Sequence, residues 1–74
     1  MERKTLLRLL KELRGTEREL DLMIAGDSKP VEFRNVVEAE ALPGKGGIKV
    51  TTKQNFIWLD AGHVAVAYQV RSDL

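Results

Sequence analysis

The chain has no cysteine, and its 74 residues include one histidine, one tryptophan, one tyrosine and two prolines. Without cysteine, neither a disulfide nor a thiolate zinc site can stabilise the fold. A single histidine leaves too few nitrogen ligands for a histidine-based metal site. A chain of this length buries only about 60% of the surface that its unfolded form exposes. We therefore expect one domain spanning residues 1–74, stabilised by core packing with help from self-association.

Long apolar runs are also missing. None approaches the roughly 20 residues that a membrane-spanning helix needs, and Arg8 interrupts the leucines at positions 6–10. No secretory leader is visible, because no small-residue cleavage site follows this short stretch. We expect a soluble, cytoplasmic protein that does not contact a membrane.

The net charge of +1 gives the chain no general affinity for nucleic acid or membrane. The charges are nevertheless segregated along the sequence. Residues 1–14 hold five bases and two acids, residues 15–42 three bases and seven acids, and residues 43–74 four bases and two acids. Such a pattern is typical of a solvated surface, and it can also steer a partner or a second copy of the chain.

Residues 2–14 have the pattern of an amphipathic helix. Leu6, Leu10 and Leu13 recur at helical spacing, and basic side chains occupy the opposite face. Gly15 follows at the position where helices often end in a left-handed residue. We expect this helix to cover a sheet; the alternative is a basic helix that binds a membrane surface or a partner.

Residues 48–70 carry the strongest strand signal. Apolar and polar side chains alternate in 48–53 and again in 63–70, and 56–60 begins with a continuous apolar run. The turn at Ala61-Gly62 predicts a C-terminal hairpin in which Val64, Val66, Tyr68 and Val70 share one face. The polar pair at 54–55 indicates a bulge or bend within one long strand.

Residues 17–25 and 31–42 fit two structures. Alternation with a period of two favours strands in both segments, with Val37 on the same face as Phe33. A capping box at Thr16 and a proline at position 30 leave helices open. If the glycine-rich turn at 43–47 joins 31–42 to 48–53 as a hairpin, the apolar side chains of the two strands must lie on the same face. Because side chains alternate between the two faces, this requires Ala41 opposite Ile48, and hence Glu40 beside Lys49.

The predicted fold is α+β, with an N-terminal amphipathic helix packed on a bent antiparallel sheet of four or five strands. In length and element order, most of the chain resembles the Sm-like small barrels, which also begin with a helix followed by five bent strands; an SH3-like barrel is a related form. No RNA-contact motif of that family is present, so the resemblance assigns no binding residues. The alternative is a winged helix, with three helices and a hairpin, whose acidic recognition helix over residues 30–42 would suit phosphates poorly.

Two motifs have residue types that often carry chemistry. The run Gly44-Lys45-Gly46-Gly47 lacks the spacing of a phosphate-binding P-loop and is interpreted as a turn. His63 follows Asp60 by three residues, as an acid–base pair would require, but no nucleophile accompanies them. We expect no catalysis, no metal site and no cofactor.

Phe56 and Trp58 are predicted to be core side chains, because large apolar groups are scarce in this chain. With Tyr68 they could instead form a platform on which bases stack. We expect a small non-catalytic module that binds protein, most simply itself, through a strand edge or the basic helix. The alternative is an RNA- or DNA-binding module. The candidate contacts to a partner or to nucleic acid are Arg8, Lys11, Lys45, Lys49, Lys53 and Arg71.

Overall fold

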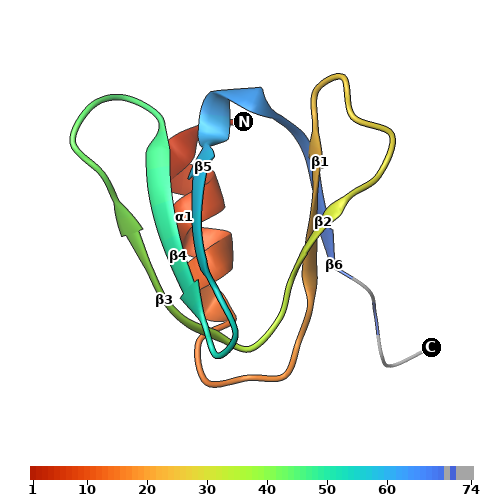
Figure 1. The fold of residues 1–74 in the computed structure, drawn as a ribbon, viewed down its shortest axis with the longest axis vertical. Coiled ribbons are helices and arrows are strands. Elements are labelled where there is room, and N and C mark those ends of the chain that lie inside the picture. The colour runs from red at the N-terminus through yellow and green to blue at the C-terminus, as the bar shows by residue number, and fades with distance from the viewer. Residues whose placement is uncertain (70, 72–74) are drawn as a thin grey trace.

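The computed structural model describes residues 1–69 and 71 and contains one α-helix and two antiparallel three-stranded sheets (Figure 1). The strand orders are β2-β1-β6 and β3-β4-β5. The fold is α+β with the helix packed on a sheet, as predicted, but the strands do not form the single bent sheet that was expected. Val70, the end of the predicted last strand, and residues 72–74 lie outside the described residues. The elements in chain order are α1 (Arg3–Glu12), β1 (Leu20–Ile24), β2 (Val31–Phe33), β3 (Val36–Ala41), β4 (Gly47–Thr52), β5 (Phe56–Asp60), the 3₁₀ helix η1 (Ala61–His63) and β6 (Val64–Gln69).

Helix α1 covers one side of the core. Its leucine stripe buries Leu6 and Leu10, and Leu13 is buried at the C-cap. The helix contacts β3, β4 and η1, and the Arg3 guanidinium donates a hydrogen bond to the carbonyl of Leu42 at 2.9 Å. Gly15 has φ +73°, the left-handed conformation that its position predicts. No helix within the described residues is long and apolar enough to cross a bilayer.

The core includes residues of α1 and of both sheets, and in Figure 1 the helix lies along the sheet β3-β4-β5. Both segments that fitted either strand or helix contain strands: β1 lies within 17–25, and β2 and β3 lie within 31–42. The winged-helix alternative requires helices there. The buried apolar residues form one cluster, which consists of Leu6, Leu10, Leu13, Leu20, Leu22, Phe33, Val36, Ala39, Ile48, Val50, Ala61 and Val64.

The register between β3 and β4 is the one that side-chain parity predicted. Ala41 pairs with Ile48, and Glu40 pairs with Lys49. This register places Ala39 beside Val50 in the core and leaves the charged pair on the outer face. The structure confirms the predicted register. The physical reason is that one face of this hairpin is buried, and a slip of one residue would expose every core side chain.

The segment 31–42 departs from its predicted face at two points. Asn35 adopts φ 58°, a left-handed conformation that separates β2 from β3. The pairing of β3 with β4 then shifts between Val36 and Glu38, so Val37 is an extra residue at a bulge. As a result Val36 is buried, whereas Val37 is 53% exposed. The prediction that Val37 faces the core is wrong.

The predicted C-terminal hairpin is also wrong. Strand β5 pairs with β4, and β6 pairs with β1, so η1 carries the chain from one sheet to the other. Residues 54–55 are not a bulge within a long strand; they belong to the tight turn between β4 and β5. The Thr52 hydroxyl accepts hydrogen bonds from the backbone N–H groups of Gln54 and Asn55, at 3.2 and 2.9 Å, and holds this turn closed.

Strand β6 changes face partway along. Its pairing with β1 shifts at Met23, so that Val64 and Val66 oppose consecutive residues of β1 and Ala65 is the extra residue. Val64 is buried, but beyond the bulge Val66 and Tyr68 are 49% and 43% exposed. The predicted common face of these three residues is therefore wrong, because one inserted residue reverses side-chain parity.

Candidate functional site

The outer face of β5 exposes the two largest aromatic side chains of the hairpin. Phe56 is 63% and Trp58 62% exposed, so the prediction that they lie in the core is wrong. Alternation along β5 turns Ile57 inward instead, where it packs against the core. The pairing explains this: Trp58 opposes Lys49, which lies between two buried residues of β4 and therefore faces outward.

Lys49 packs on both exposed rings. Its ammonium nitrogen lies 5.1 Å from the ring centre of Phe56 and 5.5 Å from that of Trp58. The two rings are 6.4 Å apart and tilted by 39°. A cation within about 6 Å of an aromatic ring centre is attracted by the electrons of the ring face. We call Lys49, Phe56 and Trp58 the aromatic patch.

An apolar groove borders the patch where the two sheets face each other. It has a volume of about 270 Å³. In Figure 1 the lining strands are β1 and β2 on one side and β5 on the other. The groove exists because the strands form two sheets: in the described sheets β5 pairs only with β4, so no strand pairing closes the space between β5 and the other sheet. The residues that line it are Leu22, Ile24, Val31, Phe33, Ile57, Trp58, Leu59, Asp60 and His63.

Strands β5 and β6 are edge strands of their respective sheets. Exposed edges are usually protected against pairing with another chain by lysine, proline or inward-pointing charges. Residues 64–69 include no charged residue, and β5 carries one, Asp60, at its end. The edge strands β2 and β3 differ, since they bear Glu32, Glu38 and Glu40. Within residues 56–59 and 64–69 neither edge strand thus carries a charge or a proline, and the bulge at Ala65, near the start of β6, is the one protecting feature of this kind.

The six predicted basic contacts do not form one surface. Arg8 and Lys11 are exposed on α1, Lys45 lies in the turn between β3 and β4, and Arg71 is exposed beyond β6. Lys49 is the member of this set that joins the aromatic patch. Lys49 thus lies beside two exposed rings, and the other five candidates lie on α1, in two turns and beyond β6.

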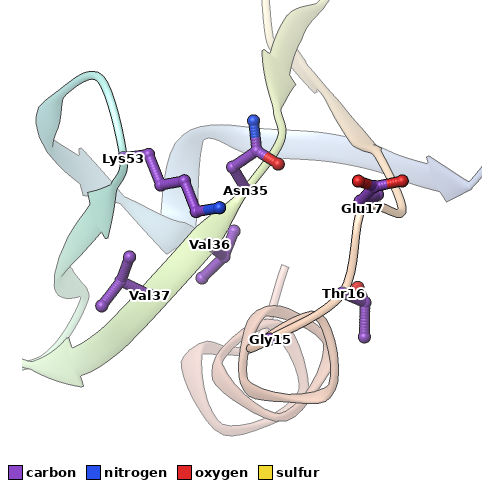
Figure 2. Close-up of a pocket in the computed structure, with 7 residues that line it drawn as sticks. All are labelled: Gly15, Thr16, Glu17, Asn35, Val36, Val37 and Lys53. Atoms are coloured by element: carbon purple, nitrogen blue, oxygen red, sulfur yellow. The ribbon is translucent and has the colours of Figure 1, made fainter.

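Lys53 lines a surface hollow of about 410 Å³ where the end of α1 approaches the start of β3 (Figure 2). Figure 2 shows its side chain extending toward Asn35 and Val36, with Glu17 on the far side of the hollow. The backbone N–H of Lys53 donates to the carbonyl of Asn35 at 3.1 Å. This hydrogen bond joins the turn after β4 to the segment between β2 and β3.

His63 and Asp60 lie side by side on an exposed turn. Their Nε2 and Oδ2 atoms are 3.9 Å apart, and their side chains are 73% and 57% exposed. Asp60 also accepts a hydrogen bond from the N–H of Gly62 at 2.9 Å, which caps η1. The geometry of the pair is thus accounted for by the turn. The glycine-rich turn packs against the same element, since the N–H of Ala61 donates to the carbonyl of Gly46 at 2.8 Å.

An acidic cluster that the sequence did not predict lies on the outer face of the sheet β2-β1-β6. One carboxylate oxygen from each of Glu19, Asp21 and Glu32 lies within 4.8 Å of the others. Glu19 forms an ion pair with Arg34, and a hydrogen bond from Arg34 lowers the pKa of Glu19. Burial, followed by the nearby Glu19 and Glu32, raises the pKa of Asp21 to about 6. Tyr68 opposes Asp21 on β6, and the pKa of Tyr68 is raised by burial and then by Asp21.

The sequence contains part of this signal. The strand pattern of 17–25 places Glu19 and Asp21 on one face, opposite the buried leucines. The third member could not be found this way, because Glu32 reaches the cluster only through the pairing of β1 with β2.

Comparison of the chain with protein-family models, curated proteins and solved structures finds no match.

Proposed function

We propose that this protein is a small, non-catalytic interaction module that self-associates by pairing the β5 edge of one copy with the β6 edge of another. The observation that carries this proposal is that two edge strands on different sheets lack charges and prolines over residues 56–59 and 64–69. Unpaired backbone groups along such an edge are a template for a strand of another chain.

The side chains beside the two edges support the same contact. Phe56 and Trp58 are exposed on β5, and Val66 and Tyr68 are exposed on β6. Pairing of these strands would join the two sheets of neighbouring copies and bring the four side chains close to the junction. Burial of their apolar surface would add to the backbone hydrogen bonds, at about 25 cal/mol per Å² removed from water.

The proposed contact pairs the edges of two different sheets, β5 of one copy with β6 of the next, so it is head-to-tail. Such contacts produce a closed ring when the rotation between copies fits, and an open filament when it does not. A ring would agree with the resemblance to Sm-like proteins, with the two sheets acting as the halves of a small barrel. We therefore favour a ring as the assembled form.

The solution mass, measured by light scattering after size exclusion, tests the proposal. The wild-type chain should elute as an oligomer, and Val66→Lys, which places a charge on the β6 edge, should lower the mass. Val37→Lys is the matched control, because Val37 is an equally exposed valine on β3. A monomeric wild type, or equal masses for wild type and Val66→Lys, would contradict self-association through this edge.

A second candidate function is nucleic-acid binding by the aromatic patch. Exposed rings with a lysine across them can stack on bases while the ammonium group meets a phosphate. Lys49 is placed in this way over Phe56 and Trp58. Glu40 opposes Lys49 from β3, however, and its carboxylate would repel a phosphate backbone. For this reason we place protein binding first.

The fluorescence of Trp58, the only tryptophan, separates these functions. Single-stranded oligonucleotide at low salt should quench it if bases stack on the patch, and the affinity should fall steeply as salt rises. Phe56→Ala retains the reporter and should weaken the quenching. Unchanged fluorescence at low salt would exclude the nucleic-acid function of this patch.

A further inference from the structure

We propose that Glu19, Asp21 and Glu32 form a binding site for a divalent cation of the calcium type. The site lies on the outer face of the sheet β2-β1-β6, and this proposal does not rest on the self-association proposed above.

The backbone holds the three carboxylates together. Asp21 pairs directly with Glu32 across β1 and β2, and Glu19 lies two residues before Asp21 and therefore on the same face. One oxygen from each residue lies within 4.8 Å of the others. Oxygens that bind one calcium ion at about 2.4 Å can be up to about 4.8 Å apart, so the cluster can accept this ion with its strands in place.

An unsatisfied atom provides a second, independent observation. Asp21 is only 6% exposed, and its Oδ1 is buried with no hydrogen-bond partner. Few buried polar atoms in folded proteins lack a partner, because the loss of solvation is costly. Arg34 pairs with Glu19 and does not satisfy this oxygen. A cation between the three side chains would supply the missing partner and offset their mutual repulsion.

The donor set indicates the kind of ion. All three side chains offer carboxylate oxygens, which suit hard cations such as calcium and magnesium. Magnesium requires ligands at about 2.0–2.1 Å in near-ideal octahedral geometry, whereas calcium accepts longer and less regular contacts. Exposed Glu32 leaves the cluster accessible to solvent, so water would complete the coordination. We therefore expect calcium to bind more tightly than magnesium.

Thermal unfolding of the full chain at neutral pH tests the site. After removal of metals with EDTA, the unfolding temperature should rise with calcium concentration and should rise less with magnesium, since a ligand of the folded state stabilises it. Sodium chloride at matched ionic strength controls for screening of the acidic groups. Isothermal titration calorimetry with calcium chloride measures the affinity directly.

Two variants and one control make the test specific. Glu32→Gln removes the negative charge of an exposed ligand without disturbing the core, and Asp21→Asn removes that of the buried one. Each should weaken calcium affinity by about 10-fold or more. Glu40→Gln, on the outer face of the other sheet, should bind calcium like the wild type. Equal unfolding temperatures in EDTA and calcium at matched ionic strength, or wild-type affinity in Glu32→Gln, would overturn the proposal.

Discussion

Replacing Asp21 by asparagine should stabilise the domain above pH 6 when no divalent cation is present. Asp21 is 6% exposed, its Oδ1 lacks a hydrogen-bond partner, and two further carboxylates lie beside it. Burial first, and then Glu19 and Glu32, raises the pKa of Asp21 to about 6. The ionised form of this side chain is therefore disfavoured by the folded state.

The sign and size of the effect follow from proton linkage. Between the ordinary pKa of 3.8 and the raised value of about 6, the folded state binds more protons than the unfolded state. The free energy of unfolding contributed by Asp21 consequently falls as the pH rises through this window, by about 3 kcal/mol in total. Asparagine avoids this loss but buries an amide that needs partners of its own. We expect a net gain of about 1–2 kcal/mol above pH 6.

Urea unfolding followed by far-ultraviolet circular dichroism measures this gain. Trp58 is a poor reporter of unfolding, since it is already 62% exposed in the folded state. The comparison requires EDTA and one fixed protein concentration, because cation binding and association both shift apparent stability. The variant should be more stable than the wild type at alkaline pH and less stable than it by about 1–2 kcal/mol below pH 4, where only the cost of the buried amide remains.

The difference in unfolding free energy between Asp21→Asn and the wild type reports on Asp21 alone, because the other carboxylates are present in both proteins. Glu19 and Glu38 have lowered pKa values, the first through its hydrogen bond with Arg34 and the second through the backbone N–H of Ala39. Both contribute stability that is lost as the pH falls, opposite to Asp21. Asp27→Asn, at an exposed turn, is the control and should change little. A destabilised Asp21→Asn at alkaline pH would refute the reasoning.

Three further substitutions test the core, the left-handed residue Asn35 and the aromatic patch. Leu10→Ala should lower the free energy of unfolding by about 2–5 kcal/mol, because it leaves a cavity under α1 at a fully buried position; urea unfolding measures this, and a smaller loss would show that the helix is not part of the core. At Asn35, with φ 58°, alanine should cost about 1 kcal/mol and glycine should be tolerated; equal stabilities would contradict the left-handed conformation. Trp58→Ala should change stability by no more than about 0.5 kcal/mol, since the side chain is mostly exposed; a loss of several kcal/mol would place it in the core.

Local patterns were sufficient for several parts of this fold. The leucine spacing of α1, the left-handed Gly15 and the pairing of Glu40 with Lys49 all follow from short-range periodicity and parity. The reason is physical: a buried face repeats with the period of its element, and a turn of fixed length leaves few registers open.

The errors arise where parity changes without a local signal. The bulges at Val37 and Ala65 each add one residue to a strand and reverse the faces of those that follow. The apolar run at 56–59 has no alternation, so only its pairing with β4 determines that Trp58 faces outward. The candidate site was missed for the same reason, because both the patch and the acidic cluster depend on which strands pair.

The proposed edge contact and the proposed cation site both involve residues of β6, but only the cation site involves β2. Val66 and Tyr68 flank the proposed edge contact, and Tyr68 also pairs with Asp21 in the acidic cluster. A cation that ties β1 to β2 would therefore act on the sheet whose other edge is β6. Glu32 lies on β2, across β1 from that edge. If Glu32→Gln loses calcium binding but keeps the wild-type mass, and Val66→Lys does the reverse, the two surfaces act separately; if either variant changes both, the central strand β1 couples them.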